Sequence, residues 1–168
     1  MSPTLQPIDL TVAVLVERKG RFLIIEETTS GKRVLTQPGG HIDDGESPEQ
    51  AAEREAAEEA RIAVAIRDLI GAYLWKDASG RQNLRIVFIA TQLAAHTDIP
   101  ADPAIHAVHW MSYAELAARQ DDLRSPSVMR CIDDYLAGER QPRSLFADCA
   151  VLNEQIETAL ASAELLTA

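Results

Sequence analysis

Three glutamates, Glu55, Glu58 and Glu59, are spaced so that a helix would project them from one side. On an isolated helix such like charges repel one another weakly. A hard divalent cation reverses the sign of that interaction, because Mg²⁺ takes oxygen ligands and completes its octahedron with water and substrate phosphates. The three carboxylates are therefore a candidate Mg²⁺ site.

A run of glutamates more often forms a solvated helix face, which Arg54 and Arg61 would partly neutralise here. The residues around the run favour the metal site, because they occur in an ordered pattern. Gly40 is followed after five residues by Glu46, and after seven more by Arg54 and Glu55. The glutamate pair Glu58-Glu59 and an aliphatic residue complete the pattern.

This pattern closely resembles the Nudix box, Gly-x5-Glu-x7-Arg-Glu-aliphatic-x-Glu-Glu-x-Gly-aliphatic. Six glycine or polar positions agree in identity and spacing, namely Gly40, Glu46, Arg54, Glu55, Glu58 and Glu59. Ala56 and Ile62 occupy the aliphatic positions, and Arg61 stands where the family has glycine. That glycine ends the helix and binds no metal, so the departure concerns local geometry more than catalysis.

The resemblance implies a role for each matching residue. The metal ligands would be Glu55, Glu58 and Glu59, together with the backbone carbonyl of Gly40. Arg54 would pair with Glu46 and hold the loop to the helix, and we count it with the catalytic residues. Either Glu55 or Glu58 would accept the proton of the attacking water. The sequence does not choose between these two glutamates.

Within the superfamily, residues 8–146 look most like the bacterial NudJ-type phosphatase group. The segments that carry this resemblance are Glu26-Glu27, Gln37-Pro38, Leu84 to Ala90, Trp110 and Leu123-Arg124-Ser125-Pro126. The resemblance implies hydrolysis of phosphoanhydride bonds in nucleoside di- and triphosphates or pyrimidine pyrophosphates. The implied cofactor is Mg²⁺, with Mn²⁺ as a substitute. The enzyme class is that of hydrolases acting on acid anhydrides in phosphorus-containing substrates.

Two other functions stay open. The first is a Nudix pyrophosphatase for another nucleoside diphosphate derivative such as ADP-ribose. The ADP-ribose group resembles a pattern with a proline after the box, and no proline occurs between Pro48 and Pro100. The second is a non-catalytic Nudix module that senses nucleotides, which we expect to lose some of the box glutamates. All of them are present, so an enzyme is favoured.

The elements that position these residues follow from local patterns. Ser47, Pro48 and Gln50 form a capping box with proline at the first helical position, which predicts a helix from Pro48 to about Ala60. Strands are predicted at 11–17, 22–28, 63–76, 84–93 and 107–111, and further helices at 112–119, 125–136 and 148–166. With the resemblance, this implies an α/β fold of the α+β kind. It would be the Nudix α/β/α sandwich with a mixed sheet and an extra C-terminal helix.

Tyr73 and Trp75 alternate along one predicted strand, so both would face the same side of the sheet. They could stack on a base or pyrimidine ring, and ordinary core packing explains them equally well. Arg85 is one of several basic residues that could meet substrate phosphate. These three residues are the expected substrate contacts.

A chain of 168 residues fits one domain, which we divide into an extension at 1–7, a Nudix domain at 8–146 and a C-terminal helix at 147–168. The net charge of −10 argues against broad contact with nucleic acid. The apolar runs are strand-sized and the N-terminus lacks a signal-peptide pattern, which favours a cytoplasmic protein without membrane contact. The expected partner is a small phosphorylated metabolite or nucleotide, and the expected assembly is a monomer or homodimer. Cys131 and Cys149 are expected to be free thiols.

Overall fold

The computed structural model describes residues 7–95 and 102–146. The strands are β1 (Asp9–Arg18), β2 (Arg21–Thr29), β3 (Lys32–Thr36), β4 (Ile62–Lys76), β5 (Gln82–Ala95) and β6 (Ile105–Ser112). The helices are α1 (Pro48–Ala60), α2 (Tyr113–Ala117) and α3 (Ser127–Leu136), with short 3-10 turns at η1 (Gln120–Asp122) and η2 (Arg143–Leu145). The predicted mixed sheet with a few helices is confirmed.

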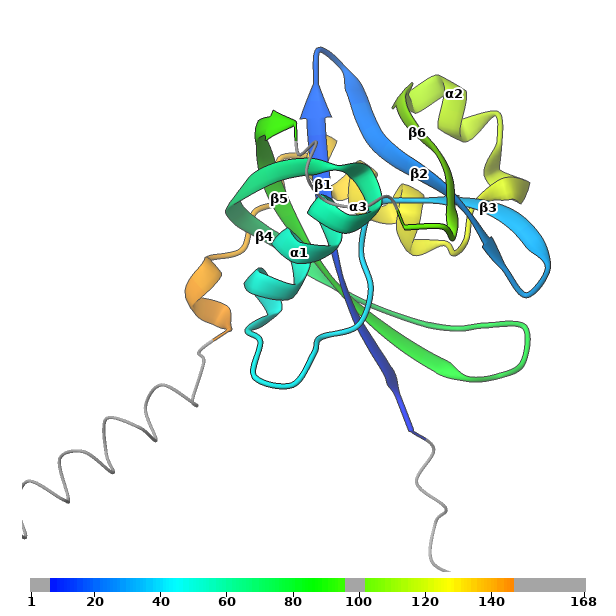
Figure 1. Ribbon diagram of the computed structural model, residues 1–168, viewed down its shortest axis with the longest axis horizontal. Helices are drawn as coiled ribbons and strands as arrows, with labels where there is room; N and C mark the ends of the chain where they lie inside the picture. The colour runs from blue at the N-terminus through cyan, green and yellow to red at the C-terminus, as the bar shows by residue number, and fades with distance from the viewer. Residues whose placement is uncertain (1–6, 96–101, 147–168) are drawn as a thin grey trace, which may run out of the picture.

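The six-stranded sheet has the order β3-β2-β1-β5-β4, and β6 also pairs with β2. β1 and β5 run parallel, with Val12 opposite Ile86 and Val14 opposite Phe88. The other pairs are antiparallel. In Figure 1, β2, β3 and β6 lie together on the right, whereas β4 and β5 have one end on the left and their connecting hairpin at the lower right. β1 joins the two halves.

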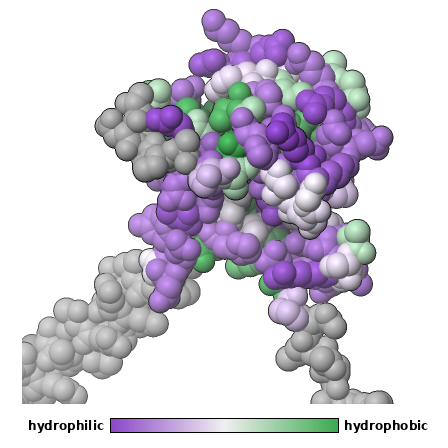
Figure 2. Space-filling view, turned by 45° about the vertical axis from the view of Figure 1, so that its right-hand side comes forward, coloured by the Kyte–Doolittle hydropathy of each residue, from purple (hydrophilic) through white to green (hydrophobic). Residues whose placement is uncertain are grey.

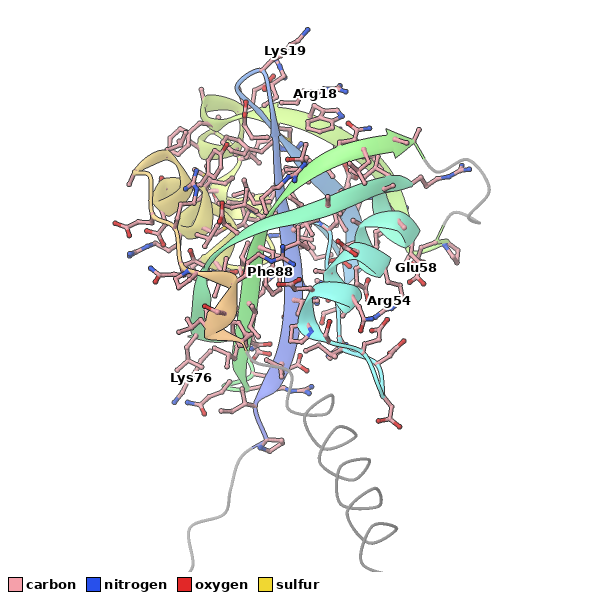
Figure 3. The ribbon with its side chains drawn as sticks, turned by 90° about the vertical axis from the view of Figure 1, so that its left-hand side faces the viewer. Arg18, Lys19, Arg54, Glu58, Lys76 and Phe88 are labelled. Carbon is pink, nitrogen blue, oxygen red and sulfur yellow. The ribbon has the colours of Figure 1, made fainter. Side chains whose placement is uncertain are left out.

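α1 and α3 cover opposite faces of the sheet (Figure 3). The buried side of α1 is made of four alanines, whose small side chains let the helix lie close to the strands: Ala51, Ala52, Ala56 and Ala60. On the other face, Ile132 of α3 packs in a second core cluster with Leu15. The outer surface in Figure 2 is mainly hydrophilic, with scattered apolar residues. Burial of apolar side chains therefore stabilises the fold in two core layers, one between α1 and the sheet and one between α3 and the sheet.

The predicted elements agree with the structure except at β3 and at some ends. α1 has the predicted bounds, and the capping box of Ser47 and Gln50 is present. α2 is shorter than predicted, and α3 begins at Ser127 without a side-chain cap. The predicted helix at 148–166 and Cys149 lie outside the described residues, so the domain division stays a prediction. Cys131 is a free thiol, as expected.

Candidate active site

The site is built on the turn from Gln37 to His41, which leaves β3 and lies along β1. The Val12 N–H donates to the Gly40 carbonyl at 2.9 Å, and the Val14 N–H donates to the Pro38 carbonyl at 3.0 Å. A Cβ atom on Gly39 would lie 2.1 Å from the Val12 carbonyl oxygen. Only glycine lets the turn pack this closely against the strand.

Two glutamates of α1 rest on this glycine turn. A Cβ atom on Gly40 would lie 2.5 Å from Oε1 of Glu55, so the absence of a side chain makes room for the carboxylate. The Gly39 N–H donates to Oε2 of Glu59 at 2.7 Å. The turn and the helix therefore bring the backbone of Gly39 and Gly40 against two carboxylates.

Arg54 ties the helix to the loop before it. Its Nε and Nη2 donate to the two carboxylate oxygens of Glu46 at 2.7 and 3.0 Å, and Nη2 also donates to the His41 carbonyl at 3.0 Å. Its Nη1 donates to Glu55 at 2.8 Å and to Glu58 at 3.2 Å. Arg54 lowers the pKa of Glu46, and that hydrogen bond raises the pKa of the guanidinium. Figure 3 shows Arg54 and Glu58 on α1.

The surroundings of Glu59 and Glu55 disfavour the charged forms of both carboxyl groups. Burial raises the pKa of Glu59 to about 8, and the charges of Glu55 and Glu27 add to the effect against the Gly39 N–H. Burial also raises the pKa of Glu55, with Glu58 contributing in the same direction. A divalent cation would relieve this repulsion.

Within residues 7–95 and 102–146, no three His, Cys, Asp or Glu side chains form a preformed metal cage. Glu55 and Glu58 instead share Nη1 of Arg54. The donors at the turn are hard oxygens, the kind that Mg²⁺ takes, and the Glu58 side chain is 47% exposed, so it can turn toward an ion. The residues therefore fit Mg²⁺ in type, with a change in side-chain orientation.

Of the residues expected to contact substrate, Tyr73 and Trp75 lie away from the glutamates, whereas Arg85 is near enough to Glu59 to act on its pKa. Tyr73 lies on the face covered by α3, where its hydroxyl donates to Asp134 at 2.9 Å. With Trp75 it lines a recess of about 410 Å³ between β4 and the start of α3. Arg85 is buried at 2% exposure, and its Nη2 donates to the Gln37 carbonyl at 2.8 Å.

Glu27 and Arg124 lie close to the acidic cluster, and the sequence analysis named them only for the family resemblance, without a role at the site. Nη1 of Arg124 donates to Oε1 of Glu27 at 2.6 Å, and Glu27 is near enough to Glu59 to raise its pKa. Arg124 also lines a second recess of about 470 Å³ that includes Pro126. The two partners are distant in the chain, so no local signal predicts their ion pair.

The family model described as the NUDIX domain matches residues 7–131. The chain belongs to the Nudix hydrolases. It is 34% identical over 139 residues to proteins named phosphatase NudJ from Shigella boydii serotype 4 and Escherichia coli strain K12, which covers 83% of this chain and 90% of each relative. A solved NUDIX hydrolase from Nitrosomonas europaea shares 36% identity at a TM-score of 0.81, covering 84% of this chain and 97% of that one.

As a Nudix hydrolase, the chain acts on phosphoanhydride bonds of small nucleotide-type substrates. Enzymes of this family generally use divalent metal ions. Among the helices that the structure describes, none is long and apolar enough to cross a membrane.

Proposed function

We propose that this Nudix hydrolase is a Mg²⁺-dependent phosphatase of nucleoside di- and triphosphates or pyrimidine pyrophosphates. The observation that carries the proposal is the packing of Glu55 and Glu59 against the glycine turn, where both carboxyl groups have raised pKa values. The 34% identity to phosphatase NudJ supports the substrate class. We also propose a cytoplasmic monomer or homodimer that binds no nucleic acid.

The proposed metal ligands are Glu55, Glu58, Glu59 and the carbonyl of Gly40. These residues would hold Mg²⁺, which would supply positive charge to neutralise the diphosphate and to acidify the attacking water. Mn²⁺, which takes the same kinds of ligand, is a substitute. Two carboxylates that already share one cationic nitrogen, Nη1 of Arg54, support this assignment.

The protein's own residues supply position and a proton acceptor. Arg54 keeps α1 aligned with the loop through Glu46, and the glycine turn brings its backbone to the carboxylates. Glu55 and Glu58 are the two candidates for the general base. Glu58 has the greater access to water, with a side chain 47% exposed against 13% for Glu55.

The ring of the substrate has two candidate positions near the start of α3. One is the recess beside Tyr73 and Trp75, and the other is the recess beside Arg124. Pro126 lines both, so they adjoin the same end of the helix. The second recess is connected to the acidic cluster through the Arg124–Glu27 ion pair. We propose that the ring binds at this end of α3, with its phosphates directed toward the glycine turn.

Removal of divalent ions tests the proposal directly. We expect chelation to abolish hydrolysis of nucleoside triphosphates and added Mg²⁺ or Mn²⁺ to restore it. Phosphate and pyrophosphate release should be measured separately, because a phosphatase of this class releases phosphate. Hydrolysis that persists after exhaustive chelation would contradict the metal mechanism.

A further inference from the structure

Arg85 is a buried cation without a direct ion pair among the described residues. It lies on β5 between Thr11 and Tyr73, at 2% exposure. Within the described part of the chain, Glu59 and Glu27 act on its charge from a distance, and its Nε has no hydrogen-bond partner. Burial lowers the pKa of Arg85 to about 10, so the group is still charged at neutral pH. Burying such a charge is costly, and among the described residues the directed contact of its guanidinium is the hydrogen bond to the Gln37 carbonyl.

Gln37 continues this buried polar chain into α3. Its side chain is 1% exposed, and its Nε2 donates to the Val128 carbonyl at 2.9 Å and to Sγ of Cys131 at 3.2 Å. The backbone of Gln37 directly precedes Pro38 and the glycine turn. Hydrogen bonds therefore run from β5 to the root of the turn, and from there to the first turns of the helix.

These hydrogen bonds satisfy buried polar atoms and also fix the position of the glycine turn. The Val12 and Val14 N–H groups hold the turn from the β1 edge, and Glu59 holds it from the α1 side. The Gln37 side chain ties it to α3, and Arg85 ties it to β5. An apolar side chain at 37 would fill similar space, but only directional hydrogen bonds fix where the turn sits relative to the helix.

We propose that Arg85 and Gln37 are positioning residues that keep the glycine turn, with Gly40 and Glu59, in register with the first turn of α3. Both side chains are almost fully buried, so they would act through the turn rather than by direct contact. This proposal rests on the proposed function, since the turn matters to the reaction only if it helps to hold the metal. The hydrogen bonds of this pair also connect the glycine turn, beside the proposed metal ligands, with the start of α3, where both recesses lie.

Three substitutions test the pair. Gln37→Met and Arg85→Met remove the hydrogen bonds but keep apolar volume, and Arg85→Lys keeps a charged donor. Mn²⁺ binding to the metal-free protein is measured by calorimetry, alongside kcat and KM for a nucleoside triphosphate. We expect each Met variant to raise the Mn²⁺ dissociation constant about tenfold and to lower kcat, with KM changed less than about twofold. Arg85→Lys should recover part of the Mn²⁺ affinity, because an ammonium group can also donate to the carbonyl.

Ile132→Val is the matched control. Ile132 lies on α3 in the second core cluster. Its substitution loosens the packing but removes none of the hydrogen bonds that hold the turn. It should lower the unfolding temperature and leave Mn²⁺ affinity unchanged. Mn²⁺ affinity equal to wild type in both Met variants would overturn the positioning role, even if they unfold at lower temperature. Failure of the wild-type protein to bind Mn²⁺ would overturn the proposed function, and the role of this pair with it.

Discussion

Glu58 is the solvent-exposed member of the cluster that it forms with Glu55 and Glu59. Its side chain is 47% exposed and contributes little to packing. Glu58→Gln keeps the shape but removes a charge that we assign to metal binding or proton transfer. We expect kcat to fall about 100-fold or more with little change in unfolding temperature.

Glu53→Gln is the control for this substitution. Glu53 lies on the same helix and accepts a hydrogen bond from the Ile66 N–H, which an amide oxygen can also accept. Its kcat should stay close to wild type. A Glu58→Gln enzyme with near wild-type kcat would show that Glu58 has neither proposed role.

Glu59 predicts how the stability of the metal-free protein depends on pH. Its pKa is about 8 in the folded chain against an ordinary value of 4.5, so folding favours the protonated form. The stability that this carboxyl contributes is complete below its ordinary pKa and is lost as the pH rises through about 8. Glu59→Gln carries no such titration and still accepts from Gly39.

The free energy of unfolding of wild type minus that of Glu59→Gln should therefore fall between about pH 5 and about pH 9. Denaturant titrations without metal measure it. Saturating Mg²⁺ should reduce the loss at the alkaline end, because the ion binds the charged form. A difference that does not vary with pH would contradict the perturbed titration of Glu59.

At the scale of elements, the end of α1 shows how the protein departs from its family pattern. Arg61 is the C-cap in a left-handed conformation, with φ 55° and ψ 41°, and its N–H donates to the carbonyl of Ala57. A side chain in this conformation costs roughly 1 kcal/mol relative to glycine, partly offset by the greater freedom of glycine in the unfolded chain. We expect Arg61→Gly to raise the free energy of unfolding by less than about 1 kcal/mol.

Activity of Arg61→Gly should stay within a few-fold of wild type, because no catalytic role is assigned to this position. Arg61→Ala keeps the Cβ atom and should bring no such gain in stability. Thermal unfolding and steady-state kinetics of both variants check the expectation. A large loss of activity in Arg61→Gly would mean that Arg61 orders the metal helix or meets substrate.

Elements with strong local signals were predictable from the sequence, and long-range partnerships were not. α1 carries its own cap, proline and alanine stripe, so its bounds were predicted correctly. β3 was missed because it is only five residues long and begins with Lys32 and Arg33, and it exists through pairing with β2. Likewise, the box glutamates have a recognisable spacing in the sequence. The hydrogen bond of Gln37 to α3 and the ion pair of Arg124 with Glu27 join residues far apart in the chain, so no spacing predicts them.

At the scale of the whole molecule, substrate choice is the main open prediction. The identity to phosphatase NudJ supports nucleoside di- and triphosphates and pyrimidine pyrophosphates over ADP-ribose. In competition at equal concentrations with Mg²⁺ present, the first group should be hydrolysed with the higher kcat/KM. Separation of the products by chromatography measures both rates in one mixture. A preference for ADP-ribose would replace the proposed substrate class and leave the metal site as proposed.

The central position of β1 also bears on the order in which the protein folds. One edge of this strand binds the glycine turn nearby in sequence, whereas the other edge requires β5, with Val12 opposite Ile86. Bringing β1 and β5 together closes a long loop, which lowers the entropy of the chain before the contacts between the strands form. Parallel pairing of this kind therefore forms slowly. During synthesis on the ribosome, the turn and α1 emerge well before β5 can secure the strand on which they rest. The chemistry of the site is thus encoded early in the chain, but it becomes available only late in folding.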